Sequence, residues 1–158
     1  MDAKLLWAII LTVLPIIELR GGMPFAVKYA LDTGSNLFLV FFAIVLLNAL
    51  IVIPIFLFLD FIHIHLIRFK WYERFSEKIL DKARRKSKSI ENKSGIALFI
   101  ALAIFVAIPL PGTGAYTGAL IAWVLNLNRK YSFIAIALGV LAAGIIVFLA
   151  SFGIISLF

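Results

Sequence analysis

The sequence predicts an all-α membrane protein made of two inverted repeats. Each repeat would hold a re-entrant helical hairpin followed by one transmembrane helix, and a cytoplasmic amphipathic helix would join the repeats. Hydrophobic residues make up 64% of the 158 positions and charged residues only 15%, whereas soluble domains are roughly 45–50% apolar and roughly 25% charged. Because soluble monomers rarely expose large apolar patches, the excess apolar surface is expected to face lipid.

We expect residues 1–158 to form a single membrane domain, with repeat one at 5–59, a basic connector at 60–94 and repeat two at 96–158. The chain has no cysteine, which excludes disulfides, thiol catalysis and cysteine zinc sites. It also lacks a phosphate-binding loop and a Ser-His-Asp arrangement. We therefore predict no enzymatic activity, no cofactor and no metal site.

The first apolar stretch, Leu5–Ile17, is too short to cross a bilayer, because a spanning helix needs about 20 residues. A polar segment at 18–24 follows, and apolar character then resumes as far as Leu31. We predict a re-entrant hairpin whose break is at 18–24 and whose second half-helix begins near Pro24. Irregular backbone at membrane depth is tolerated where protein or water covers it.

The next stretch, Leu37–Leu59, has 23 residues, which is about 34 Å of helix and enough to span a bilayer. Pro54 is expected to kink this helix. For Asn48 we favour a contact between helices over a place in the functional site.

Residues 66–94 contain ten Lys or Arg and four Asp or Glu. Apolar residues recur there at steps of three or four, which predicts an amphipathic helix along the membrane surface. The excess of positive charge predicts a cytoplasmic location beside anionic lipids. We expect no nucleic-acid partner, because the chain has no room for a nucleic-acid-binding module.

The second repeat has the same organisation. Ile96–Leu110 is followed by a Pro-Gly-Thr-Gly break at 111–114 and by Ala115–Leu127, which predicts a second re-entrant hairpin. Phe133–Phe158 has no charged residue and is long enough to span, with small residues that suit close helix packing.

A constant offset of 94 relates the two halves, pairing Pro15 with Pro109 and Leu37 with Tyr131. If each hairpin returns to the face from which it entered, residues 126–130 lie on the cytoplasmic face with the basic connector, and both termini lie outside. Interrupted segments at equivalent positions of two repeats are typical of a transport site.

Two charges in the first break, Glu18 and Arg20, are the strongest functional candidates, because charge inside a membrane is costly and usually functional. Arg20 could bind an anionic head group with two parallel hydrogen bonds. Glu18 is the proton-coupling candidate, since burial favours a neutral carboxyl group whereas the nearby guanidinium favours the charged one. Alternatively, the two residues pair and only hold the hairpin tip.

The glycines of both breaks would let backbone approach a ligand, and the half-helix starting after each break would aim its positive end at a central point. Together these features predict a site for an anion such as phosphate. The predicted substrate-binding residues are Glu18, Arg20, Gly21, Gly22, Pro111, Gly112, Thr113, Gly114, Tyr116 and Thr117.

The segments 15–24 and 109–119 resemble those of the family labelled putative small multidrug export proteins, a prokaryotic relative of the DedA/VTT superfamily. The resemblance covers nearly the whole chain. It implies paired re-entrant hairpins and a role similar to the lipid flippases and scramblases of that superfamily, some of which act on undecaprenyl phosphate. The superfamily's intramembrane acid matches Glu18 by position. Its DedA branch usually has an arginine near the second Pro-Gly motif, whereas here the arginine, Arg20, is in the first break.

The patterns predict a multi-pass cell-membrane carrier for an anion with proton coupling through Glu18, and the resemblance implies that this anion is a lipid such as a polyprenyl phosphate. Export of small amphipathic drugs and a scaffold without transport activity are the alternatives. Membrane lipids and the substrate are the expected partners, and a homodimer is left open.

Overall fold

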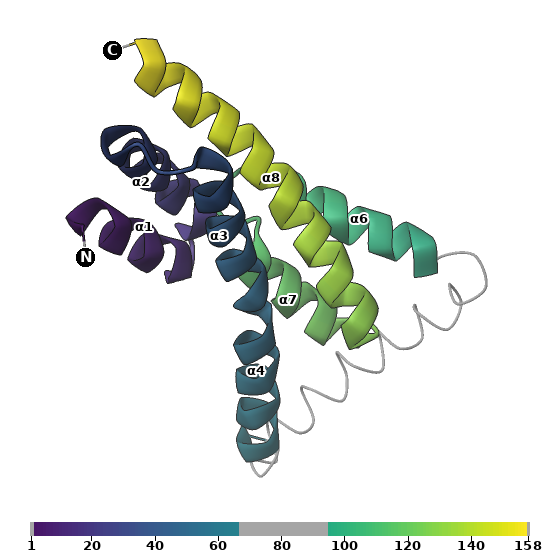
Figure 1. Cartoon of the computed structure of the whole chain (residues 1–158). Helices are drawn as coiled ribbons and strands as arrows, with labels where there is room; N and C mark the ends of the chain where they lie inside the picture. The colour runs from purple at the N-terminus through teal and green to yellow at the C-terminus, as the bar shows by residue number, and fades with distance from the viewer. Residues whose placement is uncertain (1, 67–94, 158) are drawn as a thin grey trace.

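The computed structural model describes residues 2–66 and 95–157, and the regular structure in these two segments is entirely helical (Figure 1). This confirms the all-α class. The amphipathic helix predicted for 66–94 falls outside the described residues, except for Leu66. The helices are α1 (Ala3–Val13), α2 (Glu18–Thr33), α3 (Leu37–Leu50), α4 (Val52–Leu66), α6 (Gly95–Ala107), α7 (Ala115–Val124) and α8 (Arg129–Leu157).

The first hairpin consists of α1 and α2, which lie side by side and are joined by the turn Leu14–Ile17 (Figure 1). The predicted break at 18–24 is therefore wrong, because α2 begins at Glu18 and continues through both glycines and Pro24. Glycine and proline are poor helix formers. Here the packing of α2 against α1, α3 and α8 outweighs that local preference.

Close contact between α1 and α2 depends on Gly22. A Cβ atom at this position would lie 1.9 Å from the Thr12 hydroxyl oxygen and 2.6 Å from the Ala8 carbonyl oxygen. Both distances are far below van der Waals contact. Only glycine allows the two helices to approach this closely.

Two helical stretches, Leu37–His63 and Arg129–Ile155, are long and apolar enough to cross a membrane. Each extends past one end of the span predicted from sequence. The first is divided at Ile51 into α3 and α4. Pro54 accounts for this division, since it cannot donate to the Leu50 carbonyl and its ring crowds the preceding turn. The helix is thus interrupted close to Pro54, where the sequence predicted a kink.

The second hairpin consists of α6 and α7, joined by residues 108–114. The long helix α8 packs against both helices of this hairpin, against α2 of the first hairpin and against α3 (Figure 1). Small residues permit this, as predicted. A Cβ atom on Gly139 would lie 2.6 Å from the Ala103 carbonyl oxygen, and one on Gly144 would lie 2.8 Å from Val45 Cγ2. α8 therefore holds the two hairpins in a fixed relation, and large apolar side chains remain exposed on the outer surfaces of the helices.

Ion pairs form at the start of α1 and the end of α2. The Lys4 ammonium group donates to one oxygen of Asp32, and Lys28 Nζ lies 3.0 Å from the other. Hydrogen bonds from Lys4, and then from Lys28, hold the pKa of Asp32 below its ordinary value. The contact closes the open end of the first hairpin.

We predict that Asp32→Asn lowers the melting temperature at neutral pH, and that this difference disappears under acid. A carboxyl group whose folded-state pKa is depressed stabilises the fold above its unfolded pKa of about 3.9 and stops doing so as pH falls through the folded value. Thermal unfolding of both proteins in detergent from pH 7 to pH 3 measures this. A difference in melting temperature that does not shrink as the pH falls below 4 would contradict it.

Candidate functional site

The candidate site lies where the first residue of α2 meets the first residues of α7. Glu18 is 3% exposed and has a φ of +52°, in the left-handed region that non-glycine residues rarely adopt. Its carboxylate accepts two backbone hydrogen bonds, from Ala115 N to Oε2 and from Tyr116 N to Oε1, each 3.1 Å long. The acidic residue of the first hairpin therefore caps a helix of the second.

This cap replaces one that α7 does not provide for itself. The residue at the N-cap position is Gly114, which has no side chain to accept the first backbone N–H groups. A Cβ atom on Gly114 would lie 2.1 Å from Glu18 Oε2, so the carboxylate fits only against glycine. The negative carboxylate also lies at the positive end of the α7 dipole, which stabilises both.

Arg20 also reaches the second hairpin. Its Nη2 donates to the Thr113 hydroxyl at 2.9 Å and lies 3.4 Å from the Ile108 carbonyl oxygen. The same hydroxyl is within hydrogen-bonding distance of the Ile108 and Leu110 carbonyl oxygens, at 2.6 and 2.8 Å. Arg20 Nε is buried and has no hydrogen-bond partner in the part of the chain that the structure describes. The guanidinium thus binds the loop before α7, and its Nε–H group remains without a partner among the described residues.

Two further bonds satisfy carbonyl groups at the end of α1. The Tyr116 hydroxyl donates to the Val13 carbonyl at 2.5 Å, and the buried amide of Asn48 donates to the Thr12 carbonyl at 3.2 Å. The prediction that Asn48 makes a contact between helices is confirmed. The Tyr116 bond was not foreseen, because nothing in the sequence aligns residue 116 with residue 13.

The structure thus brings Glu18, Arg20, Thr113, Gly114 and Tyr116 together. The other predicted site residues stand apart from this group. Both glycines of α2 face neighbouring side chains: a Cβ on Gly21 would meet Ile17, and Gly22 packs on α1. Pro111, Gly112 and Thr117 are exposed or half-buried, and among the described residues no hydrogen bond joins them to Glu18 or Arg20.

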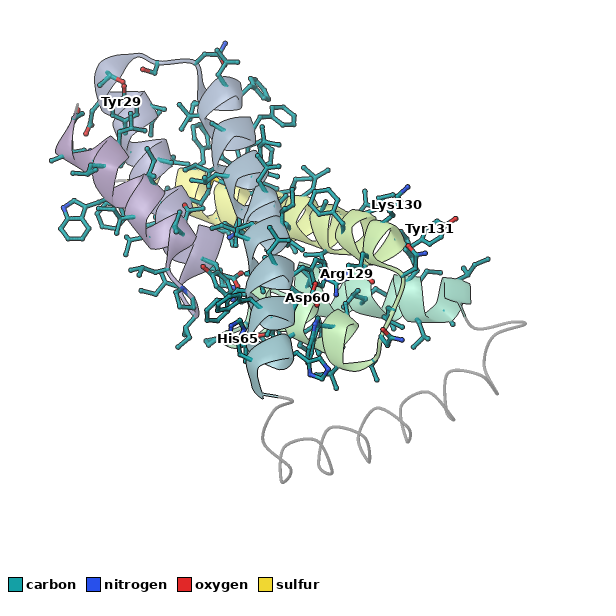
Figure 2. The ribbon with its side chains drawn as sticks, turned by 90° about the horizontal axis from the view of Figure 1, so that it is seen from below. Tyr29, Asp60, His65, Arg129, Lys130 and Tyr131 are labelled. Atoms are coloured by element: carbon teal, nitrogen blue, oxygen red, sulfur yellow. The ribbon has the colours of Figure 1, made fainter. Side chains whose placement is uncertain are left out.

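A second polar cluster lies near the other end of α7, about 12 Å along the helix from Ala115 at the usual rise. Asp60 of α4 accepts from Trp123 Nε1 at 2.9 Å and from Arg129 Nη2 at 2.6 Å. Figure 2 shows Asp60 and Arg129 side by side, with Lys130 and Tyr131 pointing away from them. Sequence reasoning missed this cluster, although a lone acid in an apolar helix was a usable signal.

Residues 18–146 match the sequence model of the family described as "Putative small multi-drug export protein". The chain belongs to this family. No curated protein and no solved structure matches it. The matched region begins at Glu18 and includes both polar clusters. Together with the two long apolar helical stretches, it identifies a membrane protein of an export family, which is not an enzyme family.

Proposed function

We propose that the protein is a proton-coupled carrier that moves an amphiphile with an anionic head group, such as a polyprenyl phosphate, across the membrane. The observation that carries this proposal is the Glu18 carboxylate, which occupies the N-terminus of α7. A helix N-terminus with free N–H groups is a general anion-binding site. Here an anion that belongs to the protein fills it.

A phosphate could take the place of this carboxylate. It would find the N–H groups of Ala115 and Tyr116, the space beside Gly114 that the displaced carboxylate leaves, and the guanidinium of Arg20. The unpartnered Nε of Arg20 supports a ligand at this point, because buried donors without partners are rare and need an explanation. The left-handed backbone at Glu18 supports the same conclusion, since such strain clusters at functional sites.

Coupling to protons follows because the Glu18 carboxylate and the substrate phosphate would compete for the N-terminus of α7. When Glu18 takes up a proton, its carboxyl group loses its charge and binds the positive end of α7 less strongly. Protonation removes the carboxylate that competes with the substrate for the N–H groups of α7. Substrate binding occupies those N–H groups, which otherwise compete with the proton for the carboxylate. Substrate binding and protonation therefore favour each other. In such a carrier, substrate binding depends on the pH at the face from which the site is open, which would let a proton gradient drive transport.

We further propose that the hairpins are re-entrant and that the two repeats are inverted in the membrane, with the basic connector in the cytoplasm. The short lengths of α1 and α7 support this arrangement. The ion pairs Lys4–Asp32 and Asp60–Arg129 also support it, since each joins two segments that the arrangement places on one face. Membrane lipids would then surround the spans.

Export of small amphipathic drugs is the second candidate function, and the family description favours it. Lipid transport and drug export would use the same carrier, and they differ in the head group of the substrate. A scaffold without transport activity would use the Glu18 and Arg20 contacts only to join the hairpins. The experiment below separates the three.

We predict that Arg20→Lys slows transport of a fluorescent polyprenyl phosphate in proteoliposomes by about tenfold or more, the loss expected for one charge-assisted hydrogen bond. Lysine keeps the positive charge and can still donate to Thr113, but it lacks the planar fork that binds two phosphate oxygens. The melting temperature should change little.

Two substrate controls accompany this variant. The matching polyprenol without phosphate should not be transported. A cationic dye transported at equal rates by parent and variant would point to drug export. Absence of flux for all three compounds in the parent would support a scaffold.

A further inference from the structure

Near the C-terminal end of α7, the guanidinium of Arg129 lies between a carboxylate and an aromatic ring. Asp60 supplies a carboxylate, and the Phe56 ring lies one helical turn away on α4. The guanidinium of Arg129 is bound to both: its Nη2 is 2.6 Å from Asp60 Oδ1, and its central carbon is 5.1 Å from the Phe56 ring centroid. A carboxylate beside an aromatic face is the usual recognition geometry for guanidinium and quaternary ammonium groups.

The two side chains of this ion pair differ in how easily they can change conformation. Asp60 has a short side chain within α4, and the indole N–H of Trp123 holds the same oxygen at 2.9 Å. Arg129 is the first residue of α8 and has a long side chain that is 48% exposed. If the pair separates, the arginine can rotate away while the carboxylate and the rings stay in place.

Space for a ligand adjoins the pair. A polar cavity of about 140 Å³ is lined by Phe56, Asp60, His63, Trp123, Asn126 and Arg129. The Asp60 side chain is 40% exposed. The cavity and the exposure give a small cationic group access to the carboxylate.

We propose that this site binds an external organic cation, a guanidinium or a quaternary ammonium group, in place of the Arg129 side chain. The proposal is independent of the anion site at Glu18. A cation is favoured over an anion because the movable partner is the positive one. An anion would have to displace Asp60, which its helix and Trp123 hold in position.

Binding is measured through the indole of Trp123, in a background where Trp7 and Trp71 are replaced by Phe. The probes are methylguanidinium chloride and tetramethylammonium chloride at millimolar concentration, with sodium chloride as the ionic-strength control. We expect saturable binding of both probes to the parent. Arg129→Ala should bind them about tenfold more tightly, because the internal competitor is gone.

Methylguanidinium should also raise the melting temperature of Arg129→Ala more than sodium chloride does. Lys130→Ala is the matched control, since it removes the same charge from the adjacent residue, which points away from the site, and it should behave as the parent does (Figure 2). Asp60→Asn should abolish binding. The gain expected for Arg129→Ala cannot result from misfolding.

Two results would overturn the proposal. The first is equal affinity of the parent and Arg129→Ala for both cations. The second is binding of sodium phosphate that is lost in Arg129→Ala while neither cation binds, which would make Arg129 the centre of an anion site. Neither result bears on transport of a polyprenyl phosphate, so the two proposals succeed or fail separately.

Discussion

Glu18→Gln should leave a protein that still binds its substrate but whose transport no longer responds to a pH gradient. The carboxylate now accepts from the N–H groups of both Ala115 and Tyr116. A glutamine keeps one accepting oxygen, replaces the other with an NH₂ group, and cannot change charge. It therefore resembles the protonated state permanently, and the coupling between protonation and substrate binding is lost.

The measurement is flux of the fluorescent polyprenyl phosphate in proteoliposomes with and without an imposed pH gradient. The parent should be accelerated by the gradient and the variant should be indifferent to it. Asp32→Asn is the matched control, because it neutralises an acid at the other end of the same helix and leaves α7 untouched. A Glu18→Gln protein that responds to the gradient as the parent does would remove Glu18 from the coupling mechanism.

Loss of half of the cap should also cost about 0.5–2 kcal/mol of stability, the range for helix N-caps. This loss is small enough for a folded, monodisperse variant. If Glu18→Gln instead fails to fold, the carboxylate serves mainly to join the hairpins. In that case the structural alternative for Glu18 and Arg20 is the correct one.

Gly22→Ala should destabilise the protein by about 3 kcal/mol or more, at the upper end of the range for overpacked cores. The added methyl group would overlap the Thr12 hydroxyl and the Ala8 carbonyl oxygen. The hydroxyl can rotate away but the backbone carbonyl cannot. α1 must therefore move away from α2, which strains the bond from Asn48 to the Thr12 carbonyl.

Thermal unfolding in detergent tests this prediction, with Gly153→Ala as the matched control. A Cβ at Gly153 meets nothing within 4 Å, and alanine is about 1 kcal/mol better than glycine inside a helix. The control should therefore be unchanged or more stable. Adding Thr12→Ala to Gly22→Ala should recover only part of the loss. A Gly22→Ala protein as stable as the parent would show that α1 and α2 do not pack this closely.

Much of the fold could be read from local sequence. Composition indicated a helical membrane protein, hydrophobic length located both long apolar helical stretches, and Pro54 marked the division between α3 and α4. The loop at 108–114 was also located closely, because Pro111 and Gly112 both oppose helix formation and Gly112 takes a φ of +85°. These features depend on short-range chemistry that a sequence states directly.

The first hairpin shows where such reasoning stops. Glycine and proline at 21–24 carry the same local cost as those at 111–114, yet α2 runs through them because Gly22 lets α1 pack closely. The break falls instead at Leu14–Ile17. Whether a poor helix former interrupts a helix depends on what packs against it, and only the folded chain contains that information.

The candidate site divides in the same way. The sequence by itself determined that Glu18 and Arg20 are costly charges in an apolar setting and that residues 111–114 form a break. Only the tertiary structure decided that Glu18 caps α7 and that Arg129 pairs with Asp60. The physical reason is sequence separation: these partners are 97 and 69 residues apart, so no local pattern pairs them, and long-range helix packing brings them together.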